Sequence, residues 1–224
     1  MKVLLVAGSP CVASPKTLCR VAQDADRIVA VDRGLDALLH AGLACDLFCG
    51  DADTVSARGR ALVDAAAAES VGAFELERYD PRKDATDLAL ALRAIEARWP
   101  GADVVATCCS GGKPDMALSV LGTLCGYCGG GVWIVEDGFC ARILRAGESW
   151  SIEGACGQRF SLVALAPDSV VSEAGLAWEL DHEPLPLLGD RGISNYVDSA
   201  RALVSCHGGC AIAYLFDERS PLAG

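Results

Sequence analysis

Two carboxylates one residue apart stand in the segment 50–54, which reads Gly-Asp-Ala-Asp-Thr and follows the apolar run 46–49. On a loop, the side chains of Asp51 and Asp53 can face one point. Oxygen ligands of this kind suit Mg²⁺, which usually takes one or two protein carboxylates together with phosphate and water. A solvated turn that caps the following helix is the commoner explanation of an isolated Asp-x-Asp pair. The pair by itself leaves both interpretations open.

A second acidic segment, 83–87, reads Lys-Asp-Ala-Thr-Asp and opens a predicted helix. Asp84 is the expected N-cap of that helix, and Asp87 resembles the acidic half of a capping box. Lys83 does not fit this explanation, because a cation at a helix N-terminus opposes the helix dipole. We interpret Lys83 as a phosphate contact beside a metal ion.

Two further loops follow apolar runs. The segment 110–115 reads Ser-Gly-Gly-Lys-Pro-Asp, and 31–34 reads Val-Asp-Arg-Gly. A glycine-rich loop between a strand and a helix can present N–H groups to phosphate, although a proline after Lys113 excludes a P-loop. Each loop alone is a weak signal. Four such loops after four strands of one sheet are harder to explain as ordinary turns.

The elements that position these loops alternate along the first 137 residues. Apolar strands are expected at 3–7, 28–31, 46–49, 73–76, 104–107 and 132–135, and helices at 16–23, 35–41, 57–68, 85–98 and 116–125. This alternation predicts an α/β domain with a mostly parallel sheet and helices on both faces. Ligands of such sheets bind beyond the carboxyl ends of the strands, where the four loops lie.

The pattern changes after Asp137. Short apolar runs at 141–144, 149–152, 160–165, 170–172, 203–206 and 210–215 are separated by Gly, Pro and Asp. This pattern is typical of a small all-β sandwich or barrel. We therefore predict an α/β domain over residues 1–137 and an all-β domain over residues 138–224.

Composition restricts the function. The formal net charge of −11 is not that of a nucleic-acid-binding protein, and no apolar stretch approaches the roughly 20 residues of a membrane span. We expect a soluble, cytoplasmic protein. Its twelve cysteines are then expected to be reduced core residues. Cys125 and Cys128 have redox-motif spacing but follow a predicted helix instead of opening one.

Taken in order, the segments resemble the thiamine pyrophosphokinase family over essentially the whole chain. Residues 83–87 match the family's Lys-Asp-x-Thr-Asp, the most specific of its motifs. Similar segments, with their family counterparts, are 31–39 (Asp-Gly-Gly-Ala-Asn-x-Leu), 45–54 (Pro-Asp-Leu-Ile-Ile-Gly-Asp-Phe-Asp-Ser), 111–116 (Gly-Gly-Arg-x-Asp-His), 175–180 (Gly-Leu-Lys-Trp/Tyr-x-Leu) and 192–195 (its Ser-Asn pair). Arg33, Asp36 and Met116 depart from the pattern, which has Gly, Asn and His there.

The resemblance implies Mg²⁺-dependent transfer of a pyrophosphoryl group from ATP to the hydroxyl of thiamine, giving thiamine diphosphate and AMP. It also implies a homodimer with thiamine near the subunit interface. On this basis the expected residues are Asp51, Asp53 and Asp87 for the metal, Lys83 with them in catalysis, Asp32, Asp84, Lys113 and Asp115 for ATP, and Trp178, Ser194 and Asn195 for thiamine.

Two alternatives remain open from the sequence. A pyrophosphokinase for another heterocyclic alcohol, such as a pterin, would keep the acidic loops and change the region around Trp178 and Asn195. A module that binds thiamine or a nucleotide without turnover would also keep much of the pattern.

Overall fold

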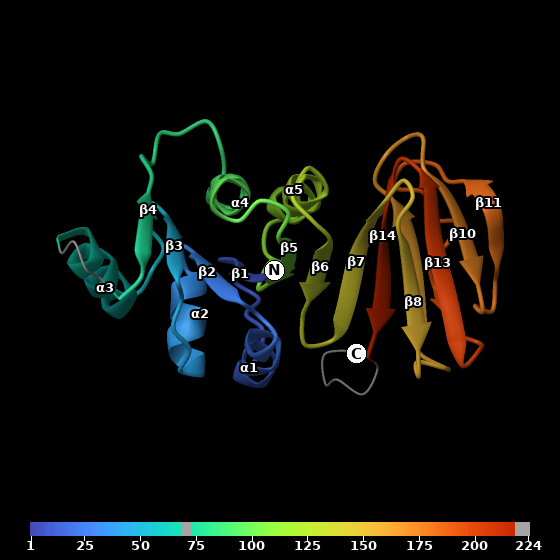
Figure 1. The fold of residues 1–224 in the computed structure, drawn as a ribbon, viewed down its shortest axis with the longest axis horizontal. Helices are drawn as coiled ribbons and strands as arrows, with labels where there is room; N and C mark the ends of the chain where they lie inside the picture. Colours follow the sequence, from blue (N-terminus) through green and yellow to red (C-terminus); the bar gives the residue numbers. More distant parts are fainter. Residues whose placement is uncertain (69–72, 218–224) are drawn as a thin grey trace. The chain divides into compact units, whose positions relative to one another are not determined.

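A computed structural model describes residues 1–68 and 73–217 of the 224-residue chain (Figure 1). The chain forms two compact units. Unit 1 comprises residues 1–130 and 134–136, and unit 2 comprises residues 131–133 and 137–224. Within the described ranges, no helix combines the length and the apolar character needed to cross a membrane.

Unit 1 is built on a parallel sheet. Its paired strands are β1 (Lys2–Val6), β2 (Arg27–Val31), β3 (Leu47–Gly50), β4 (Glu75–Arg78) and β5 (Asp103–Thr107), in the order β5-β1-β2-β3-β4. The central strands are rich in Val and Leu and are buried along almost their whole length. Such continuous apolar strands are expected where helices cover both faces of a sheet.

The helices of unit 1 lie on the two faces as predicted. They are α1 (Pro15–Gln23), α2 (Gly34–Ala41), α3 (Ala57–Ala68), α4 (Asp87–Arg98) and α5 (Pro114–Cys125). In Figure 1, α1 and α2 lie below the strands, and α4 and α5 lie above them. The expected N-cap at Asp84 is wrong. The hydroxyl of Thr86 accepts the N–H of Ala89 instead, so α4 begins three residues later than Asp84.

Unit 2 is a sandwich of antiparallel strands. One layer contains β12 (Asn195–Tyr196), β9 (Arg159–Ala164), β14 (Cys210–Phe216) and β7 (Phe139–Arg145); the other contains β11 (Leu180–Pro184), β10 (Val170–Ala174), β13 (Arg201–Gly208) and β8 (Ser149–Glu153). A single core that includes Trp150, Phe160 and Val204 joins the layers. Strand β6 (Val132–Val135) spans the residues where the chain changes unit.

The predicted fold class, α/β followed by all-β, is confirmed. Three strands differ from the prediction. Strand β4 lies two residues later than the predicted run 73–76, while β11 and β12 were not predicted at all. Both missed strands carry mostly polar or exposed side chains, so they lack the apolar alternation that marks a strand in sequence.

Candidate active site

Asp32 lies directly after β2 and has a backbone φ of 45°. Its own N–H donates to the carbonyl of Cys49, and its Oδ1 accepts the N–H of Ala52 at 3.3 Å. Aspartate tolerates this left-handed conformation better than most residues do. The turn thus ties the end of β2 to the end of β3 and directs the Asp32 carboxylate along the carboxyl edge of the sheet.

Asp51 lies directly after β3, behind a glycine that the site requires. A Cβ atom at Gly50 would stand 1.9 Å from Asp32 Oδ1, so any other residue type would displace the Asp32 carboxylate from its place beside Asp51. Asp51 Oδ1 accepts the N–H of Asp53 at 3.1 Å, and its Oδ2 accepts a hydrogen bond from Lys83 Nζ at 2.9 Å. Burial raises the pKa of Asp51, but the contacts from Lys83 and from the Asp53 amide outweigh it and the pKa is lowered.

Lys83 connects Asp51 with Asp87, the first residue of α4. Lys83 Nζ is 3.0 Å from Asp87 Oδ1, a distance that makes an ion pair, although this oxygen has no hydrogen bond of acceptable geometry. Burial lowers the pKa of Lys83, yet the two carboxylates more than compensate and raise it. The ammonium group is therefore firmly charged where it lies between them.

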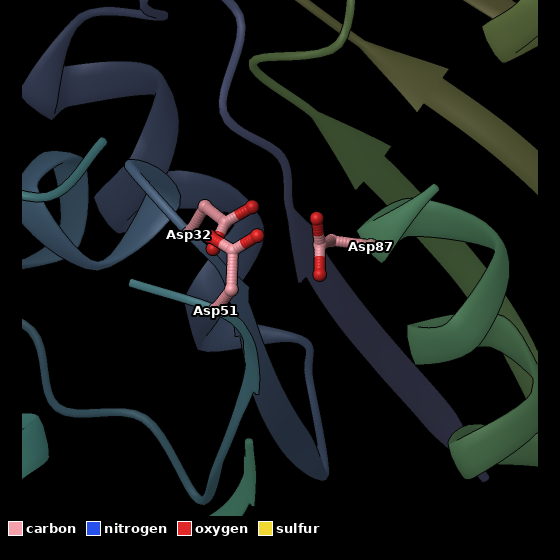
Figure 2. Close-up of side chains that lie close together, drawn as sticks. All are labelled: Asp32, Asp51 and Asp87. Carbon is pink, nitrogen blue, oxygen red and sulfur yellow. The ribbon is translucent and has the colours of Figure 1, made fainter. Parts of the chain in front are cut away.

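Asp32, Asp51 and Asp87 form one cluster. One carboxylate oxygen from each lies within 4.8 Å of the others, and Figure 2 shows Asp87 pointing from α4 toward Asp32 and Asp51. Burial raises the pKa of Asp32 to about 7, with a further contribution from the negative charge of Asp87. Three carboxylates at this spacing repel one another, and a cation among them relieves that repulsion.

Two predicted residues of the acidic loops, Asp53 and Asp84, lie outside this cluster. Asp53 is exposed and follows the cluster on the same loop; burial and then the charge of Asp51 raise its pKa. Asp84 is exposed, and it does not line the cavity beside the cluster that is described below. The structure therefore groups Asp32, predicted as a nucleotide contact, with two of the three predicted metal ligands.

A cavity of about 550 Å³ adjoins the cluster. Its walls include Asp32 and Asp87 together with the predicted nucleotide contacts Lys113 and Asp115. Lys113 is the N-cap residue of α5, and Asp115 lies in the first turn of that helix. Gly111 and Gly112, both with φ near +80°, pack against the loop after β1, where a Cβ at Gly111 would meet Cys11 Sγ at 2.6 Å. This is why the loop after β5 carries two glycines.

Sequence reasoning missed Glu136, which holds the start of that loop. Its carboxylate accepts the N–H groups of Cys108, Cys109 and Ser110 at 3.0 to 3.2 Å. Burial raises the pKa of Glu136, and the three amides act in the opposite direction. These amides are therefore engaged within the chain. In the sequence, Glu136 directly follows the apolar run 132–135, and this position is the signal that could have pointed to it.

The predicted thiamine residues of unit 2 lie close together but differ in exposure. Trp178 is 64% exposed, whereas Asn195 is 2% exposed. The Asn195 amide accepts the N–H groups of Trp178 and Tyr196 and donates to the Trp178 carbonyl and to Glu173. Asn195 thus fixes the backbone of Trp178, and Trp178 is not a core residue.

Ser194, the third predicted thiamine residue, lies in the left-handed region with a φ of 58°. Its N–H donates to Ser161 Oγ at 3.0 Å, and its own Oγ accepts from Arg159 at 3.3 Å. The hydroxyl is exposed on the surface next to the buried Asn195.

The comparisons with known proteins decide the family. The family described as thiamin pyrophosphokinase, catalytic domain, matches residues 18–130, half of the chain. The chain belongs to the thiamin pyrophosphokinase family. It is therefore an enzyme that makes thiamine diphosphate. A comparison with curated proteins gives no significant match.

Solved thiamin pyrophosphokinases share the fold over nearly the whole chain. The structure from Bacillus subtilis has a TM-score of 0.79 at 21% identity, covering 97% of this chain and 100% of that one. The structure from Candida albicans has a TM-score of 0.78 at 14% identity, covering 96% and 90%. The yeast structure has a TM-score of 0.75 at 12% identity, covering 99% and 88%.

Of the three departures from the family pattern, two lie in the wall of this cavity. Arg33 and Met116 line it. Asp36 lies in the first turn of α2, where its carboxylate accepts both the N–H and the hydroxyl of Ser56. Gly34 keeps the family's glycine. A side chain at this position would clash, because a Cβ would stand 2.0 Å from the carbonyl oxygen of Val6.

Proposed function

We propose that this enzyme transfers the pyrophosphoryl group of ATP to the hydroxyl of thiamine, using the cluster of Asp32, Asp51 and Asp87 as its Mg²⁺ site. The observation that carries the proposal is the convergence of these carboxylates at the carboxyl edge of the sheet in a member of this family. Edges of this kind are where α/β sheets bind their ligands.

The donor set fits Mg²⁺. All three side chains offer carboxylate oxygens, and Asp87 Oδ1 is buried without a hydrogen bond. Mg²⁺ prefers such hard oxygen ligands and neutralises phosphate charge when it is bound. Asp53, on the same loop, would complete the site through its exposed carboxylate.

The remaining residues of unit 1 bind and orient the nucleotide. Lys113 and Lys83 bring positive charge to the neighbourhood of the acidic cluster, and Asp115 lines the cavity wall. Phosphoryl transfer depends mainly on positioning and on charge stabilisation. Because Glu136 engages the amides of residues 108–110, the lysines take the larger share of the phosphate contacts.

Unit 2 supplies the acceptor contacts. Trp178 offers a large exposed aromatic face for stacking on a ring of thiamine, with Ser194 as a polar contact beside it. We assign Asn195 to holding this surface rather than to direct hydrogen bonding, because its amide is satisfied within the chain. The family resemblance supports a homodimer, and the expected location in the cytoplasm rests on the sequence.

An assay of AMP release in the presence of Mg²⁺ tests the proposal. Thiamine is expected to support release, and a hydroxymethyl pterin is not. Asp51→Asn should lower kcat at least 100-fold, in line with the loss of a preorganised charge contact of about 3 kcal/mol. Asp24→Asn, an equal charge change at the exposed C-cap of α1, is the matched control. Full activity of Asp51→Asn at saturating Mg²⁺ would overturn the metal assignment.

A further inference from the structure

A second cavity, of about 610 Å³, opens beside the first. Its walls come from α2 and from the start of α3, and they carry Arg33, His40 and Arg58. Two arginines around one cavity stand out in a chain with a formal net charge of −11. The cavity is therefore a local concentration of cationic groups in an acidic protein.

The arginines of this cavity are available to a ligand. Within the described part of the chain, neither Arg33 nor Arg58 takes part in an ion pair, whereas eight other arginine and lysine side chains do. Both side chains are exposed. A guanidinium group presents several N–H donors in a planar fork that matches phosphate oxygens.

The carboxylate in the wall, Asp36, offsets one of the two arginine charges, but its oxygens already have hydrogen-bond donors in the chain. Asp36 accepts the N–H of Ser56 at 2.7 Å and also its hydroxyl, so its oxygens are directed into the chain. Ser56 in turn accepts the N–H of Gly59 through Oγ and that of Arg60 through its carbonyl, which starts α3. A Cβ at Gly59 would stand 2.8 Å from Asp36 Oδ1. Asp36 thus fixes the helix start that carries Arg58.

The start of α3 adds to the positive potential. α3 spans twelve residues (Ala57–Ala68), and Arg58 lies in its first turn. Free N–H groups and the helix dipole favour an anion at this end of a helix. Arg58 therefore projects from a position that already attracts negative charge.

The two cavities share part of their walls. Arg33 and Thr54 line both of them, and Thr54 follows the loop of Asp51 and Asp53. Arg33 stands next to Asp32, at the position where the family pattern has glycine. A group bound in the second cavity consequently lies next to the phosphates of a nucleotide bound in the first.

We propose that the second cavity is a phosphate-binding subsite formed by Arg33 and Arg58. The phosphate comes either from the polyphosphate chain of the nucleotide or from a separate phosphate ion or ester. The existence of the subsite rests on the cavity itself, and only its use by the nucleotide rests on the proposed function.

Calorimetric titration of Arg58→Gln with ATP, AMP and inorganic phosphate tests this proposal. If the nucleotide chain reaches the subsite, Arg58→Gln should weaken ATP binding about tenfold, which corresponds to about 1.4 kcal/mol, and leave AMP binding unchanged. If a separate phosphate binds, the wild-type protein should take up inorganic phosphate when saturated with ATP, and Arg58→Gln should not.

Two further variants make the result specific. Arg93→Gln removes the same charge from the exposed face of α4 and should bind all three ligands as the wild type does. Arg58→Lys keeps the charge and should recover part of the binding. Equal binding of ATP and phosphate by wild type, Arg58→Gln and Arg93→Gln would overturn the subsite. Because none of these titrations measures turnover, that outcome is distinct from a failure to form thiamine diphosphate.

Discussion

At the scale of single residues, Lys83 is the group that holds the acidic cluster together. Its ammonium lies between Asp51 and Asp87 with an exposed side-chain fraction of only 15%. Lys83→Met should lower the free energy of unfolding by about 2 kcal/mol, because it leaves mutually repelling carboxylates without a counter-charge. Mg²⁺ should restore part of this loss. Urea denaturation with and without Mg²⁺ measures both effects, and a variant that responds no more to Mg²⁺ than the wild type would contradict the account.

Glu173 predicts a pH dependence in unit 2. It is 1% exposed, and burial raises its pKa from an ordinary 4.5 to about 7. The folded state therefore holds the proton more tightly than the unfolded state. The resulting stabilisation is fully present below about pH 4.5 and is lost as the pH rises through 7.

The variant Glu173→Gln isolates this contribution, since glutamine can still accept from Asn195 Nδ2 as Glu173 does. Between pH 4.5 and 8, the wild type should lose about 3 kcal/mol of unfolding free energy relative to the variant. Denaturation of both proteins at the two pH values gives the difference. A difference that does not change with pH would show that Glu173 does not titrate in this range.

The residues of the site were predictable to different extents. Asp51 and Asp87 stand in motifs whose spacing is local, so sequence alone could propose them as site residues. Asp32 lies beside them because β2 and β3 are neighbours in the sheet, and the local sequence does not indicate which strands pair. The satisfied amide of Asn195 likewise depends on a hydrogen bond to Glu173, 22 residues away.

At the scale of elements, the turn between β2 and α2 tolerates little change. At Gly34, the first residue of α2, an added Cβ would stand 2.0 Å from the carbonyl oxygen of Val6. Gly34→Ala should therefore destabilise the protein by about 2 to 3 kcal/mol. Thermal unfolding measures the effect.

Gly122→Ala is the matched control for Gly34→Ala. Gly122 lies inside α5, and an added Cβ would have no neighbour within 4 Å. Alanine is the better helix former, so this variant should gain about 0.5 to 1 kcal/mol. If both variants shifted the unfolding temperature in the same direction, steric crowding at Gly34 could not be the cause.

The sequence predicted the helices and strands well where an element buries one face or its whole length. The apolar strands β1, β2, β3 and β5 and the five helices were all expected close to their observed positions. Strands β11 and β12 were missed because pairing with neighbours, and not burial of their own side chains, makes them strands. Propensity is a weak guide in such edge positions.

At the scale of the whole molecule, the exposure of the cysteines is a test of how the chain packs. All twelve are thiols that form no disulfide, and Cys11, Cys128 and Cys156 are the exposed ones. Cys125 ends α5 rather than opening it, so the helix dipole does not favour a thiolate there. The native protein should therefore present three thiols that react rapidly with a thiol reagent, and the denatured protein twelve. Cys11→Ser should lower the rapid count by one, and rapid modification of most cysteines in the native state would contradict the packing.

The division of the chain into an α/β part and an all-β part follows from hydrophobic periodicity, and this level was the most predictable. The change from helical spacing to short apolar runs separated by turn residues is visible without any contact information. The assignment of ATP to residues 1–137 and of acceptor binding to residues 138–224 stays a prediction.

Glu136 bears on how this protein can be divided. It is the last residue of unit 1 before the chain continues into unit 2, and it supplies the acceptor for three backbone amides of the loop after β5. A fragment that stopped at residue 130, where the family match ends, would leave those amides without their acceptor. The smallest fragment worth expressing for the nucleotide site therefore ends no earlier than Glu136, six residues past the recognisable catalytic region.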